Sequence, residues 1–145
     1  MALTLLEPSS AEDFQRYYDL RWKVLRAPWN QPKGSEKDDI ERESIHVMVC
    51  ETDRIPVGVG RAHFDSTTEA QIRYMAVDET CQGQGVGGMV LRELERRIKQ
   101  NGRTHIFLNA RENAVDFYKK HGYQIVGDGH TLFGEVRHWK MEKII

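Results

Sequence analysis

The sequence predicts an α/β fold of the α+β type, in which a mixed, mostly antiparallel sheet of about seven strands carries about four helices on its faces. Two observations lead to this prediction. Through residues 45–77, apolar side chains alternate with polar ones in short segments separated by turn residues, as is typical of strands. On both sides of this region, apolar residues recur every three or four positions, as in helices. A length of 145 residues suits one domain, so we expect residues 1–145 to fold together.

The first third of the chain predicts two helices. Ser10 is a suitable N-cap for a helix that ends near residue 26, because two acidic residues follow it in the first turn. Residues 28–34 contain two prolines, an asparagine and a glycine, which indicates a loop. Ser35 with Asp38 three positions later favours a second helix, shorter and more polar than the first.

The middle of the chain predicts an antiparallel meander. Strands are expected at residues 45–50, 57–64 and 69–77, with turns at 52–54 and 65–68. Connections this short join antiparallel neighbours, because parallel strands need a longer crossover.

The last third predicts a return to helices and then strands. Apolar residues every four positions indicate a helix over residues 86–98, and Asn101–Gly102 would end it. A strand at 104–108, a helix at 111–121 and strands at 123–126 and 132–141 complete the chain. This order does not alternate regularly between strand and helix, so it argues against a regular βαβ array.

Composition narrows the classes of function. The chain has 21 basic and 22 acidic residues, and this balance argues against a nucleic-acid partner. The N-terminal apolar run lacks a basic flank and a cleavage motif, so neither a signal peptide nor a membrane helix is expected. Cys50 and Cys81 are the only cysteines, which suggests a reducing, cytoplasmic setting. The six histidines show no metal-ligand spacing, so no metal is expected.

The most informative segment is a glycine-rich loop that opens the helix at residue 86. Glycines let the backbone approach a ligand closely, and the first N–H groups of a helix are unpaired and electropositive, so this loop suits a diphosphate. Its spacing also matches G-x-G-x-x-G, but no acidic residue ends the next strand, which argues against a nicotinamide dinucleotide. A glycine-rich turn without a ligand remains the alternative. The loop comprises Gln82, Gly83, Gln84, Gly85, Val86, Gly87 and Gly88.

Two motifs carry a resemblance to a known family. Gln82, Gly85 and Gly87 fit Q/R-x-x-G-x-G/A, and residues 114–123 fit A-x-x-F-Y-x-x-x-G-F/Y, with Tyr118 as its tyrosine. On these motifs the chain resembles the GCN5-related N-acetyltransferases over its whole length. It is also similar to the acetyltransferase half of bacterial acetyltransferase/hotdog-thioesterase fusion proteins.

The resemblance implies a function and roles for its residues. It implies the fold of that family and acetyl transfer from acetyl-CoA to a primary amine, which attacks the thioester directly. The backbone of residues 84–88 would hold the pyrophosphate, and Tyr118 would act as general acid to the CoA thiolate. The remaining coenzyme-binding candidates are Met75, Ala76 and Val77, which would pair with the pantetheine arm, and Asn109 and Asn113.

The chain departs from the family pattern in ways that leave a second function open. Some relatives carry a glutamate base at the position of Gln71, which cannot accept a proton, so the general base is unassigned and Glu69 is one candidate. Arg111 stands where the family often has asparagine. The alternative is therefore an inactive CoA-binding sensor or interaction module.

The acceptor site is the least determined. Trp29 and Glu36, with the acidic residues after it, would suit a small-molecule or peptide amine that is cationic, although this segment also reads as a solvated helix. Glu69 and Arg73 share one face of their strand and are further candidates. A late exposed strand leaves a homodimer open.

Overall fold

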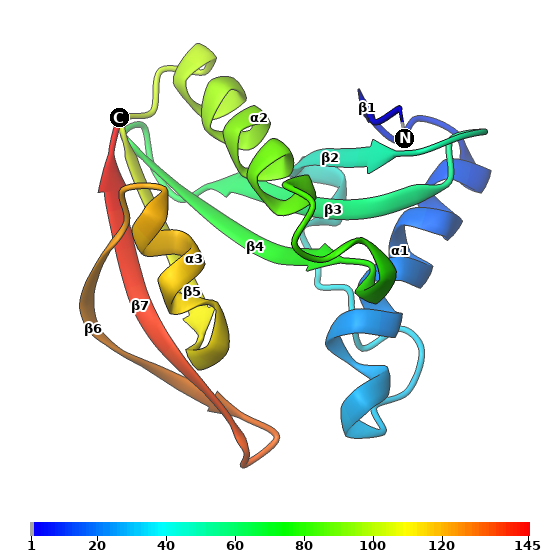
Figure 1. Ribbon diagram of the computed structural model, residues 1–145. Helices are drawn as coiled ribbons and strands as arrows, with labels where there is room; N and C mark the ends of the chain where they lie inside the picture. Colours follow the sequence, from blue (N-terminus) through cyan, green and yellow to red (C-terminus); the bar gives the residue numbers. More distant parts are fainter. Residues whose placement is uncertain (1) are drawn as a thin grey trace.

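The computed structural model describes residues 2–145 and contains one seven-stranded mixed sheet with the order β1-β2-β3-β4-β5-β7-β6 (Figure 1). β4 and β5 form the one parallel pair, and the other five pairs of neighbours are antiparallel. The predicted sheet and its central meander are therefore confirmed. The strands are β1 Thr4–Leu6, β2 Ile45–Cys50, β3 Pro56–Phe64, β4 Glu69–Val77, β5 His105–Arg111, β6 Gln124–Leu132 and β7 Val136–Ile144.

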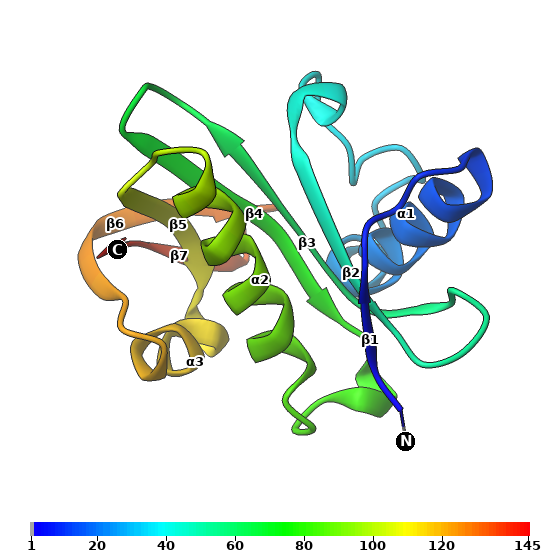
Figure 2. The ribbon, with the colours of Figure 1, turned by 90° about the horizontal axis from the view of Figure 1, so that it is seen from above.

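Within residues 2–145, three α-helices cover the two faces of the sheet. α1 (Ala11–Leu25) lies on one face, and α2 (Val86–Gln100) and α3 (Val115–Lys120) lie on the other (Figure 2). No helix of residues 2–145 is both long enough and apolar enough to cross a membrane. The described part of the chain also contains four short 3₁₀ helices: η1 Ala27–Trp29, η2 Glu41–Glu43, η3 Glu79–Cys81 and η4 Glu112–Ala114.

The start of α1 follows from local sequence. The hydroxyl of Ser10 accepts the backbone N–H of Asp13 at 3.0 Å, and the Asp13 carboxylate accepts the backbone N–H of Ser10 in return. This capping box satisfies N–H groups that the first turn leaves free, as the sequence predicts.

Two glycines bring α2 close to the sheet. A Cβ at Gly60 of β3 would lie 2.6 Å from a methyl of Val90, and one at Gly58 would overlap Val86. The absence of side chains at these positions therefore allows α2 to pack directly on β3.

The predicted second helix at Ser35 is wrong. The segment after η1 consists of turns followed by η2, because two of its acidic side chains, Asp38 and Glu41, bind inward instead of lying on a solvated face. Asp38 pairs with Arg61 at 2.6 Å, and Glu41 pairs with Arg21 at 2.9 Å.

Two later boundaries are also wrong. β5 continues to Arg111, so the helix expected from residue 111 begins as η4 and becomes α3 at Val115. The strand expected over residues 132–141 contains the turn between β6 and β7. Phe133 and Gly134 have φ of 56° and 71° there, which reverses the chain.

β4 and β5 separate partway along their length. Their pairing is limited to Glu69–Ile72 of β4 and residues 105–108 of β5. Beyond this point β4 stays on β3 as far as Val77, and β5 stays on β7 as far as Arg111. A bulge in β4 accompanies the separation: the register with β3 shifts, and Tyr74 takes a left-handed φ of 57°.

Candidate active site

A cavity of about 310 Å³ lies where β4 and β5 separate. Residues of β4 and β5 line two of its sides, and the end of α1, α3 and the β6–β7 hairpin supply the others. Four residues singled out from the sequence line it: Arg73, Met75, Asn109 and Tyr118.

Tyr118 lies between this cavity and the core. The side chain is 7% exposed and packs edge-on against Tyr123, with ring centroids 5.7 Å apart. Burial is the one influence on the pKa of its hydroxyl from residues 2–145, and no hydrogen bond to them acts on it. Burial raises the pKa of Tyr118 well above its ordinary value, so the phenol keeps its proton at neutral pH.

Phe117, the neighbour of Tyr118, supports the glycine loop. Its ring would lie 3.2 Å from a Cβ at Gly87, so the loop rests on this ring at the start of α2. The two adjacent aromatic residues of α3 therefore have different surroundings, and only Tyr118 lines the cavity.

The glycine loop presents unpaired backbone donors. No N–H group of residues 82–88 donates a hydrogen bond within the described chain, whereas the N–H of Met89 starts the ladder of α2 by donating to Gly85 at 3.1 Å. Gly83 and Gly85 have φ of 79° and 82°, which L-residues rarely adopt. Free donors at a helix start suit the phosphates of a coenzyme.

The open edge of β4 lies between the loop and the cavity. Residues 73–77 have β3 on one side and no strand on the other, since the pairing with β5 ends at Ile72. Met75, Ala76 and Val77 belong to this edge, and Met75 also lines the cavity. An extended ligand arm could add to this edge as a further strand does.

An ion-pair network holds the bulge of β4 against α1. The guanidinium carbons of Arg21 and Arg73 lie 4.3 and 4.5 Å from the ring centroid of Tyr74. Asp38 bridges Arg61 and Arg73 at 2.6 and 3.1 Å. Burial acts to raise the pKa of Asp38, but hydrogen bonds from Arg61 and from the backbone of Ile40 outweigh it and lower the pKa to about 2.

Two arginines in the cavity wall were not predicted from the sequence as site residues. Arg26 follows α1, Arg111 ends β5, and both donate to the backbone carbonyl of Leu25 at 3.0 Å. Burial lowers the pKa of Arg111 to about 10, and the nearby charge of Arg26 contributes. His130 and His138 stack beside them in the wall, with ring centroids 4.3 Å apart. No local pattern marks Arg26, whereas Arg111 was noticed only as a departure from a motif.

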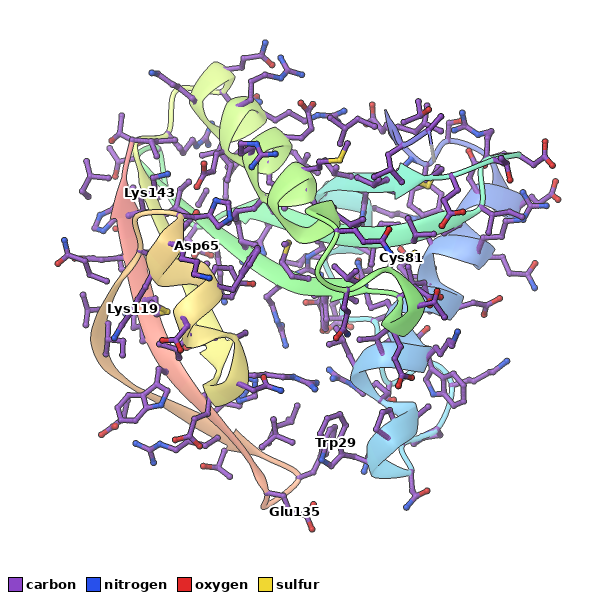
Figure 3. All side chains as sticks on the ribbon, in the orientation of Figure 1. Trp29, Asp65, Cys81, Lys119, Glu135 and Lys143 are labelled. Carbon is purple, nitrogen blue, oxygen red and sulfur yellow. The ribbon has the colours of Figure 1, made fainter. Side chains whose placement is uncertain are left out.

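Other acceptor candidates lie elsewhere. Trp29 lines a second, shallower cavity on the other side of Arg111, together with Asn113, which the sequence had suggested as a coenzyme contact. Figure 3 places Trp29 between the segment after α1 and the tip of the β6–β7 hairpin. Glu36 lines neither cavity, since its carboxylate turns back to accept the N–H of Gly34 at 2.7 Å. Glu69 also lines neither, because it begins β4 opposite His105, at the closed end of the strand pair.

Comparisons with known proteins agree with this architecture. The uncharacterized N-acetyltransferase YjcF of Bacillus subtilis (strain 168) is 31% identical over 132 residues, covering 91% of this chain and 93% of the relative. A crystal structure of an aminoglycoside 6'-N-acetyltransferase complexed with coenzyme A superposes with a TM-score of 0.81 at 19% identity, covering 99% and 97% of the two chains. Ard1 from Thermoplasma volcanium gives 0.82 at 23% identity, covering 100% and 99%.

The family assignment rests on the sequence match. Residues 14–123, from α1 to the end of the tyrosine motif, match the profile of the family described as "Acetyltransferase (GNAT) family". The matched region contains the glycine loop, the bulged β4 and Tyr118. The chain therefore belongs to the acetyltransferase (GNAT) family.

Proposed function

We propose that the protein transfers an acetyl group from acetyl-CoA to a primary amine by direct attack, with Tyr118 as general acid. The observation that carries the proposal is the Tyr118 phenol, buried and with no hydrogen bond from the described chain acting on it, at the point where the open edge of β4 meets the cavity. The coenzyme, when bound, supplies a thioester whose carbon accepts the amine.

The residues present suit two parts of the coenzyme, the pyrophosphate and the pantetheine arm. The free N–H groups of residues 82–88 would hold the pyrophosphate at the positive end of α2. Backbone groups of residues 75–77 would bind the pantetheine arm, which carries amides of its own. This arrangement directs the thioester into the cavity toward Tyr118.

Tyr118 would act where negative charge develops. As the amine nitrogen bonds to the carbonyl carbon and the carbon–sulfur bond breaks, the sulfur gains an electron pair and the Tyr118 hydroxyl donates its proton. The amine loses one proton, and the phenol takes one back from solvent, which balances the reaction. Burial raises the pKa of a thiol as well as that of a phenol. In a site without water the two pKa values therefore stay close enough for a proton to pass from the phenol to the thiolate.

A Tyr118→Phe variant tests this role. We expect turnover with an amine panel to fall about 10²–10⁴-fold, the usual contribution of a positioned general acid, whereas acetyl-CoA affinity changes less than about twofold. Tyr123→Phe is the matched control, since it removes a buried phenol that does not line the cavity. Equal turnover in wild type and Tyr118→Phe would contradict the acid role.

The alternative of an inactive CoA-binding module has one observation in its favour. Gln71 lines the cavity, and none of the lining residues is Asp or Glu, so the cavity wall contains no carboxylate base. A sensor would bind acetyl-CoA and release no thiol with any amine. Thiol release measured across the panel distinguishes the two functions.

A further inference from the structure

We infer that the amine acceptor carries an anionic group, a carboxylate or a phosphate, which Arg26 and Arg111 bind in the cavity. This inference rests on the proposed function and narrows it to a substrate class. It replaces the cationic acceptor that the acidic residues after Trp29 suggested.

The first argument is the charge of the cavity wall. It includes Arg26, Arg73 and Arg111 and two histidines, and none of its residues is acidic. Arg73 is already paired with Asp38 at 3.1 Å. Arg26 and Arg111 form no ion pair within residues 2–145, so two positive charges of the wall have no salt-bridge partner, although the carboxylate of Glu36 outside the wall acts on Arg26 from a greater distance.

The second argument is the closeness of these two charges. Because each guanidinium donates to the same Leu25 carbonyl at 3.0 Å, the two donating nitrogens lie no more than about 6 Å apart. Arg26 is 7% exposed. Two partly desolvated cations at this distance repel each other, and an anion between them would compensate both.

The third argument is that both side chains are held in place. The guanidinium carbon of Arg111 lies 4.5 Å from the ring centroid of Trp29, and that of Arg26 lies 5.5 Å from the ring of Phe133. The Trp29 and Phe133 rings stack in turn, at 6.4 Å. Arg26 also donates its Nε to the carbonyl of Ser35 at 3.0 Å, so its Nη2 and the remaining nitrogens of Arg111 are the donors left for an oxyanion, and they need little reorganisation to bind it.

The fourth argument is position. Arg26 follows α1, which lies on the face of the sheet opposite the glycine loop and α2 (Figure 2). The coenzyme phosphates would bind at the start of α2, so these arginines lie apart from that site. A cation pair here therefore suits the acceptor.

Steady-state kinetics with matched amines tests the inference. Glycine is compared with glycinamide, and O-phosphoethanolamine with ethanolamine, with 1,3-diaminopropane as a cationic acceptor. We expect kcat/KM for at least one anionic member to exceed that of its neutral partner more than tenfold. Equal or faster reaction of the neutral members or the diamine would overturn the inference. The better of the two anionic acceptors identifies the oxyanion.

Variants identify the residues. Arg111→Gln should lower kcat/KM for the anionic acceptor more than tenfold and change the neutral one less than twofold, while Arg111→Lys should restore part of the loss. Arg103→Gln is the matched control, since Arg103 also stacks on a ring, Phe64 at 3.9 Å, and donates to backbone carbonyls. An equal loss in Arg103→Gln, or weaker acetyl-CoA binding in Arg111→Gln, would overturn the assignment.

A binding measurement separates this inference from the proposed function. Inorganic phosphate and acetate are titrated into the wild type at saturating coenzyme A, and the indole N–H resonance of Trp29 is followed by NMR. Saturable binding that weakens more than tenfold in Arg111→Gln supports the anion site even if no amine is acetylated. Failure of both anions to bind overturns the inference even if amines are acetylated.

Discussion

Gly60 shows how a single residue determines the spacing between α2 and the sheet. A Cβ there would lie 2.6 Å from Val90, 2.7 Å from the sulfur of Met75 and 2.9 Å from Leu94. Three side chains from two elements would have to move, and one of them, Met75, lines the cavity.

We therefore predict that Gly60→Ala lowers the free energy of unfolding by about 1–3 kcal/mol, the usual effect of overpacking a core. Urea denaturation measures it. Gly127→Ala is the control, because a Cβ at Gly127 meets nothing within 4 Å, and it should change stability by less than about 0.5 kcal/mol. Equal midpoints for the two variants would show that the core accommodates the methyl.

The identity of a residue predicts some of the positive φ angles in this chain and fails to predict others. The positive φ angles of Gly83 and Gly85 are expected of glycines before a helix. The positive φ of Tyr74 has no such signal, because nothing in its neighbours marks a tyrosine for a left-handed conformation. The bulge is held by contacts from distant arginines instead.

Among the elements, the segment between α1 and β2 depends on charges contributed by the sheet. Asp38 joins it to Arg61 of β3 and Arg73 of β4. The folded-state pKa of Asp38 is about 2, below the ordinary value of about 3.9 in an unfolded chain. The carboxylate therefore contributes stability above about pH 4, and this contribution is lost as the pH falls toward 2.

We predict that Asp38→Asn destabilises the protein at pH 7 by about 1–3 kcal/mol, the value of hydrogen bonds to a charged group. The difference from wild type should narrow between pH 4 and pH 2, as urea midpoints at several pH values would show. Asp39→Asn is the control, since Asp39 is exposed and forms no ion pair among the described residues. A difference that is constant with pH would contradict the role of the charge.

The same segment explains which elements sequence alone can predict. α1 and α2 have caps and apolar periods within their own residues, so local reasoning finds them. The Asp38 side chain looks solvated in the sequence, because its partner Arg61 lies more than 20 residues away. Once the sheet brings that charge near, turns satisfy Asp38 better than a helix does.

For the molecule as a whole, we expect coenzyme binding to raise the melting temperature, Tm. A ligand that binds only the folded state at 100 times its Kd adds about 2.7 kcal/mol. For a chain of this size, that corresponds to a rise in Tm of about 5–10 °C.

We predict such a rise with acetyl-CoA and none with NAD, measured by differential scanning calorimetry. NAD also contains a pyrophosphate, so it tests whether the glycine loop alone suffices or whether the open edge of β4 is needed. Stabilisation by NAD and not by acetyl-CoA would contradict the assignment of coenzyme A as the ligand of this site.

The site as a whole was predictable only in part. The glycine loop and Tyr118 are continuous motifs, so the sequence presents them directly. Arg26 and Arg111 are 85 positions apart and meet only because the end of α1 packs across the separated end of β5. Such a pair depends on the complete fold, and no local pattern contains it.

The short pairing of β4 with β5 has one more consequence. Only four residues of β4 pair with four residues of β5. The two parts of the sheet, β1–β4 and β5–β7, are therefore joined by one short stretch of hydrogen bonds. A coenzyme that contacts both parts of the sheet, where β4 and β5 have separated, would link these parts a second time. Deuterium uptake by the amides of Glu69, Ala70, His105 and Ile106, four paired residues that do not line the cavity, should then slow on coenzyme binding.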